Sequence, residues 1–92
     1  MLRLTVSFSQ PTQAVLRVEG WVDGPGAGLL EREGMPLLRL GAGLTVDLAG
    51  ARFIDHDGLE LLDRWRRRGV RVRGGSPFIR ALLTGAGEAA PA

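Results

Sequence analysis

The chain opens with two segments in which apolar and polar residues alternate. Residues 2 to 8 place leucine, valine or phenylalanine at every second position, and residues 14 to 19 continue the alternation after Gln10-Pro11-Thr12-Gln13. A period of two is typical of a β-strand that buries one face. Because so few residues separate the two segments, we expect them to pair as a hairpin.

The next segment changes to a looser, helical spacing of leucines. Asp23-Gly24-Pro25 is a typical helix start, and a short helix is predicted over 26 to 33. Gly34 and Pro36 then predict a break, because a proline inside a continuous helix costs about 3 kcal/mol. One further turn is expected over 36 to 40.

Alternation returns in the second half of the chain. Residues 44 to 48 predict a third strand that ends at Ala49-Gly50, followed by a loop through Arg52. A fourth strand is predicted over 70 to 73. Ser76-Pro77 then predicts the start of a short helix that runs through Leu83.

The clearest helix lies between these last two strands and begins near Asp57. Gly58, Leu61, Leu62 and Trp65 stand at positions i, i+3, i+4 and i+7, which is the apolar stripe of an amphipathic helix. Its acidic residues come early and its arginines late, as the helix dipole favours. Trp65 is therefore expected in the core.

Two carboxylates at the start of this helix have the spacing of a capping arrangement. Asp57 would accept a backbone N–H, and Glu60 would reach back to the first turn. A cap contributes only about 1 kcal/mol and many residues can supply it, so a functional surface at the turn remains compatible with capping.

Together the elements predict an α/β fold of two layers, with a mixed sheet of four to five strands and the helices on one face. Right-handed crossovers that step in one direction place every helix on the same side of the sheet. One domain over 1 to 84 and a flexible tail over 85 to 92 are expected. The uncovered sheet face would carry polar residues: Arg3, Thr5, Arg17, Glu19, Asp47, Arg71 and Arg73.

Composition removes several classes of function. The 92 residues include no cysteine and one histidine, so a thiol nucleophile, a disulfide and a thiolate metal site are excluded. Residues 24 to 28 lack the lysine of a phosphate-binding loop and are interpreted as a flexible linker. No long apolar run predicts a membrane span or a signal peptide, and the expected compartment is the cytoplasm.

All twelve basic residues are arginines, and ten acidic residues offset them to a net charge of +2. Six of the arginines lie between 64 and 73, which offers nucleic-acid binding through the helix end as an alternative. No interleaved aromatic residues or helix-turn-helix spacing accompany them, so a solvated helix end is the favoured interpretation and no nucleic-acid partner is expected.

The order of elements, combined with Gly20-Trp21-Val22-Asp23, the strand Val46-Asp47-Leu48-Ala49-Gly50, the turn 53 to 59 and Gly74-Gly75-Ser76-Pro77-Phe78, resembles the STAS family. The resemblance spans residues 2 to 83. It implies a non-catalytic protein-docking module of the anti-sigma-factor-antagonist type. The small subunit of a phospholipid ABC transporter is the alternative within the same family.

In antagonist members of the family, a serine or threonine that precedes the glycine of this turn is phosphorylated by a partner kinase. Asp57 occupies that position here, so switching by serine phosphorylation is not expected. A carboxylate carries about one negative charge, against about 1.5 to 2 for a phosphoserine, and is a partial and permanent mimic.

The predicted contact surface for a protein partner is the turn and the exposed face of the following helix: Asp55, His56, Asp57, Gly58, Glu60 and Arg64. The partner would be a kinase-like anti-sigma factor or a transporter subunit, and homodimerisation is left open. Asp55-His56-Asp57 lacks the nucleophile of an acid–base site and the converging ligands of a metal site. No enzyme activity, metal or cofactor is therefore expected.

Overall fold

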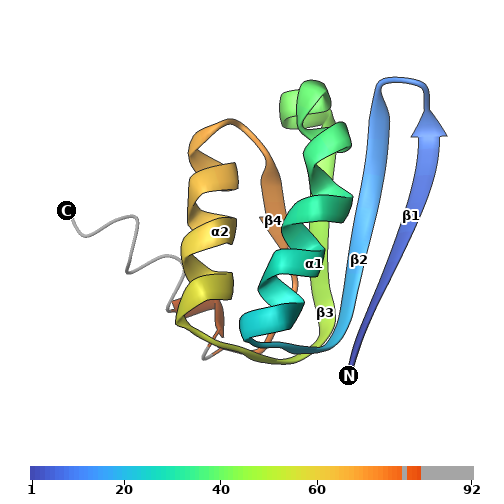
Figure 1. Ribbon diagram of the computed structural model, residues 1–92. Helices are drawn as coiled ribbons and strands as arrows, with labels where there is room; N and C mark the ends of the chain where they lie inside the picture. Colours follow the sequence, from blue (N-terminus) through green and yellow to red (C-terminus); the bar gives the residue numbers. More distant parts are fainter. Residues whose placement is uncertain (78, 82–92) are drawn as a thin grey trace, which may run out of the picture.

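The computed structural model describes residues 1–77 and 79–81. Four strands form one twisted sheet, and the helices pack in a layer on one of its faces (Figure 1). The elements follow one another as β1 (Leu2–Gln10), β2 (Gln13–Val22), α1 (Gly24–Gly34), the 3₁₀ helix η1 (Met35–Gly43), β3 (Leu44–Ile54), α2 (His56–Arg67) and β4 (Arg71–Arg73). The predicted two-layer α/β architecture is confirmed, with a four-stranded sheet.

The strands lie in the order β1-β2-β3-β4, which is also their order in the sequence. The predicted hairpin is present, with β1 antiparallel to β2, while β2, β3 and β4 run parallel. Each parallel pair is joined by a helical crossover, α1 with η1 before β3 and α2 before β4. The sheet is therefore mixed, as expected, and β1 and β4 form its edges.

The hydrophobic core lies between the sheet and the helix layer. Alternate residues of β2 and β3 form its sheet side. Leu30, Leu61, Leu62 and Trp65 form its helix side, and each of these four is exposed by 2% or less. Helix α1 passes close to α2 at Gly34, where an added Cβ atom would collide with the Trp65 ring. The predicted core position of Trp65 is confirmed, and the glycine that we expected only to end a helix also makes room for this ring.

Two predictions about loops are wrong. Residues 24 to 28 form the first turns of α1, and β3 continues through the predicted loop to Ile54. The pairing of β3 with β2 shifts register twice along this extension, and Arg52 is the extra residue at the second shift. Such bulges break the strict alternation of apolar and polar residues, and for this reason the sequence pattern did not predict a strand beyond residue 49.

The break near Pro36 has a different form from the one expected. The chain continues from α1 directly into η1, with the proline in the first turn, where its missing N–H removes no hydrogen bond. Near the carboxyl end, residues 77 and 79–81 are helical, and the Ser76 hydroxyl accepts a hydrogen bond from the Ile79 N–H at 3.1 Å. The predicted end of this helix at Leu83 and the predicted tail, 85 to 92, lie outside the described residues.

The other face of the sheet carries the predicted row of polar side chains. The strand register aligns Thr5, Arg17, Asp47 and Arg73 across all four strands. Asp47 is nevertheless only 8% exposed, because Arg73 reaches its carboxylate at 3.4 Å and the Ala49 N–H donates to it at 2.9 Å.

Candidate functional site

The turn that connects β3 to α2 is held by Asp55. Its carboxylate accepts a hydrogen bond from the Gly58 N–H at 2.9 Å, and its own N–H donates to the Val22 carbonyl at 2.9 Å. Asp55 is thus the N-cap of α2, and the prediction of Asp57 as the cap is wrong. Since the cap lies two residues earlier than expected, Asp57 falls in the first helical turn, and its exposed carboxylate is not needed to start the helix.

Gly58 fixes how closely α2 approaches the ends of the central strands. It is buried, and a Cβ atom there would lie 2.8 Å from a methyl group of Val22 and 2.8 Å from a methyl group of Ile54. Its backbone is not in the left-handed region, so the glycine is required by close packing and not by its φ angle. Asp55 and Gly58 are therefore structural parts of the site.

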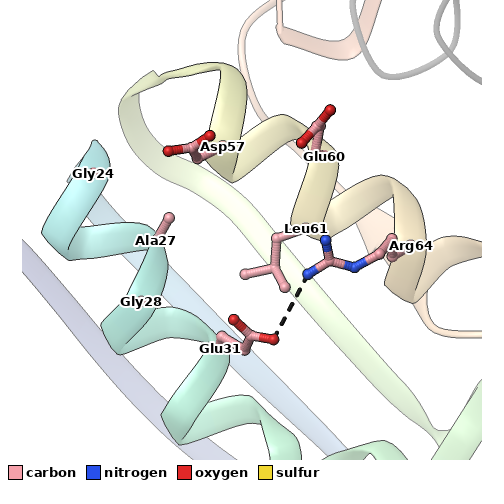
Figure 2. A pocket seen from close by; sticks show the side chains of 8 residues that line it. All are labelled: Gly24, Ala27, Gly28, Glu31, Asp57, Glu60, Leu61 and Arg64. Atoms are coloured by element: carbon pink, nitrogen blue, oxygen red, sulfur yellow. Dashed lines mark ion pairs between the residues drawn. The ribbon is translucent and has the colours of Figure 1, made fainter.

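A groove of about 260 Å³ lies between α1 and α2 beside this turn (Figure 2). Asp57, Glu60, Leu61 and Arg64 line it from α2 at the spacing i, i+3, i+4 and i+7. The facing stripe on α1 has the same spacing: Gly24, Ala27, Gly28 and Glu31. Two helix faces with matched periodicity therefore form the walls.

The α1 wall is shallow because three of its four residues are glycine or alanine. A Cβ atom at Gly24 or Gly28 would meet no other atom within 4 Å, so the groove has open space in front of both positions. These residues were not predicted as site residues, because 24 to 28 were interpreted as a linker. The spacing of Gly24, Ala27, Gly28 and Glu31 could have indicated a common helix face, had the helix been extended to residue 24.

The charged groups of the groove are mainly acidic. Glu31, Asp57 and Glu60 line it together with a single guanidinium group, that of Arg64. The Glu60 carboxylate points away from Arg64 (Figure 2) and lies 3.1 Å from His56. Arg64 reaches across to Glu31 at 3.6 Å, and these side chains are 55% and 50% exposed (Figure 2). An ion pair this exposed contributes little to stability, so both groups can exchange it for contacts with a partner.

Five of the six predicted site residues therefore divide into two groups, and His56 belongs to neither. Asp57, Glu60 and Arg64 meet at the groove, whereas Asp55 and Gly58 hold the turn beneath it. His56 does not line the groove; its side chain is 81% exposed and lies 3.1 Å from the Glu60 carboxylate. Among residues 1–77 and 79–81, no group of three or more histidine, aspartate or glutamate side chains is placed to hold a metal ion.

No family model and no curated protein matches this sequence, but solved structures do match the fold. The anti-sigma factor antagonist SpoIIAA, in its unphosphorylated form, aligns with a TM-score of 0.72 and 15% identity over 90% of this chain and 83% of its own. An anti-sigma factor antagonist from Mycobacterium paratuberculosis aligns with a TM-score of 0.72 and 22% identity over 94% of this chain and 80% of its own.

A third structure, that of Mglu, aligns with a TM-score of 0.60 and 23% identity over 79% of this chain but only 19% of its own length. The same arrangement therefore also occurs there within a longer chain. These alignments confirm, at the level of the fold, the resemblance that the sequence motifs indicated. This chain has the fold of the anti-sigma factor antagonists, the STAS fold.

Proposed function

We propose that this chain is a cytoplasmic, non-catalytic docking module that binds a protein partner through the groove between α1 and α2. The observation that carries the proposal is the pair of matched helix stripes. Apart from Glu31, the α1 stripe consists of glycine and alanine, which leaves space in the groove for a partner's side chain. The fold that this chain shares with anti-sigma factor antagonists supports the same function.

The charge of the groove specifies the chemistry of the partner. Three carboxylates against one guanidinium group favour a docking surface rich in arginine or lysine. Electrostatic complementarity of this kind mainly raises the association rate and the specificity of binding, and it weakens as salt screens the charges.

Regulation by serine phosphorylation is not part of the proposal. By the resemblance of the turn to the STAS family, Asp57 corresponds to the phosphorylated hydroxyl of antagonist members, and its carboxylate is exposed in the first turn of α2. The negative charge is therefore permanent, and binding at this surface is constitutive or is regulated through the partner.

The test uses substitutions that fill the groove or reverse one of its charges without disturbing the core. Gly28→Trp places a ring in the open space of the α1 wall, and Asp57→Lys reverses a charge on the α2 wall. A photocrosslinking residue at position 24 identifies the partner in the native host, and the affinity of that partner is then measured by titration. We expect each variant to weaken binding at least tenfold.

Glu33→Trp is the matched control, because residue 33 is an exposed position of α1 outside the groove. The proposal is wrong if Gly28→Trp and Asp57→Lys both bind like the unmodified protein, or if Glu33→Trp is impaired as strongly. The identity of the crosslinked protein also decides the alternative: a permease or ATPase would make the chain a transporter subunit. The described residues include no helix long and apolar enough to cross a membrane.

A further inference from the structure

The polar face of the sheet, opposite the helices, carries the net charge of the described molecule. Five arginines and two acidic residues lie on this face: Arg3, Arg17, Arg52, Arg71, Arg73, Glu19 and Asp47. Elsewhere in the described residues, seven arginines are offset by seven acidic residues. The helix layer is therefore neutral as a whole, and the sheet face has an excess of three positive charges.

Within the described part of the chain, only one of the five arginines of this face is paired with a carboxylate. Asp47 is buried beneath Arg73 and pairs with it, while the side chain of Glu19 lies against Gly50. Among the described residues, Arg3, Arg17, Arg52 and Arg71 form no ion pair within 4.0 Å. Four guanidinium groups are thus available to an anionic ligand.

Three arginines near the end of α2, in contrast, are paired with carboxylates. Arg66 and Arg67 lie 2.8 Å and 2.7 Å from the Asp63 carboxylate, and Arg64 pairs with Glu31. The helix end that suggested nucleic-acid binding in the sequence is therefore partly neutralised by its own neighbours. The excess positive charge therefore lies on the open face of the sheet and not at the end of α2.

Two aromatic side chains are exposed on the same sheet face. Trp21 and Phe53 are cross-strand partners on the central strands β2 and β3, and their rings lie 5.4 Å apart at an angle of 40°. They are 50% and 42% exposed, although large aromatic side chains normally bury themselves. Beside Trp21, a shallow hollow of about 360 Å³ is also lined by Arg3 and Arg52.

We propose that this face binds single-stranded nucleic acid. Exposed aromatic rings on a sheet can stack with unpaired bases, and arginines spread along the strands can contact the phosphates. Both features occur here on one surface, whereas an acidic polypeptide would use the charge without needing the aromatic pair. The inference concerns the face opposite the groove and does not depend on the proposed docking function.

The experiment measures binding of fluorescein-labelled 15-nucleotide oligo-dT and oligo-U by anisotropy between 20 and 200 mM salt, roughly the range over which phosphate contacts are screened. With up to four arginine contacts, the slope of log K against log salt should reach about −3. Trp21→Ala should weaken binding about tenfold by removing a stacking surface, and Trp21→Phe should restore most of it.

Charge placement is tested with two double variants that change the net charge equally. Arg17→Glu with Arg71→Glu alters the sheet face, and Arg32→Glu with Arg39→Glu alters exposed positions of α1 and η1. The first pair should abolish binding. The second should retain it within about threefold at about 150 mM salt, where the Debye length is about 8 Å and more distant exposed charges are screened.

Three results would overturn the proposal. One is the absence of an anisotropy change at the lowest salt with a folded protein. Another is equal loss of binding in both double variants, which would indicate attraction to net charge alone. The third is displacement of the oligonucleotide by poly-glutamate at an equal concentration of charges, which would assign the face to acidic polypeptides.

Discussion

Gly28 and Gly58 are both helical residues of the candidate site, but their surroundings are opposite. Gly28 faces open space, whereas Gly58 is pressed against the methyl groups of Val22 and Ile54. Glycine in a helix interior is unfavourable relative to alanine, so each must be judged by what an added methyl group would meet.

Substitution of each glycine by alanine should therefore change stability in opposite directions. Gly28→Ala should raise the free energy of unfolding by about 0.5–1 kcal/mol through helix propensity alone. Gly58→Ala should lower it by about 1–2 kcal/mol, since overpacking outweighs the gain in propensity. Urea denaturation of the two variants checks both signs, and stabilisation by Gly58→Ala would contradict the close packing of α2.

The two aspartates of the turn make a second comparison at this scale. Asp55 accepts the Gly58 N–H, so Asp55→Ala should cost about 1 kcal/mol of stability. Asp57→Ala should change stability by less than about 0.5 kcal/mol, because an exposed first-turn carboxylate interacts only weakly with the helix dipole. Equal losses in denaturation midpoint would mean that both residues cap the helix.

At the scale of elements, α1 and α2 are held together by the core beneath them and only weakly by charges above it. Trp65 packs against Gly34 at the end of α1, while the Glu31–Arg64 ion pair spans the exposed groove. Packing therefore fixes the distance between the helices, and the ion pair is free to rearrange.

A double-mutant cycle on Glu31→Gln and Arg64→Gln should accordingly give a coupling of less than about 0.5 kcal/mol, and the coupling should decrease with added salt. Gly34→Ala provides the contrast, because its methyl group would collide with the Trp65 ring. We expect that variant to lose about 1–3 kcal/mol of stability and to shift the emission of Trp65. A coupling above about 1 kcal/mol would show that the ion pair helps to set the helix spacing.

At the scale of the whole molecule, the sheet separates the two proposed surfaces. The helices cover one face of the sheet and leave the other open (Figure 1). The groove lies between α1 and α2, and the basic aromatic face, formed by Arg3, Arg17, Trp21, Arg52, Phe53 and Arg71, lies on the open side of the sheet. No residue that lines the groove also lines the hollow beside Trp21. A small domain can thus offer two contacts without a cleft between lobes.

The two surfaces should behave independently. Gly28→Trp should leave oligonucleotide affinity within about twofold of the unmodified protein, and Arg17→Glu should leave partner affinity within the same limit, as expected for sites without shared contacts. Titration of the crosslinked partner in the presence of saturating oligo-U measures the coupling directly. Mutual displacement of the two ligands would mean that they share one surface.

The candidate site could be predicted from the sequence only in part. The turn and the exposed face of α2 were found because an apolar stripe of period 3.6 leaves a definite polar face. The α1 wall was missed because Gly24, Gly26 and Gly28 are poor helix formers, and tertiary packing outweighs their weak intrinsic preference. The cap was misplaced by two residues because Asp55 and Asp57 are equally good N-cap residues in isolation.

The periodic elements and the two-layer α/β fold were determined by the sequence alone, because alternation and helical spacing record which side of each element is buried. Only the tertiary structure decided where the functional surfaces lie. The groove exists because one stripe of α1 and one stripe of α2, far apart in the chain, face one another. The basic aromatic face exists because the strand register places Trp21 beside Phe53 and the arginines on the same side of the sheet. Which arginines pair with carboxylates likewise depends on distances in the folded chain, and these cannot be inferred from the net charge.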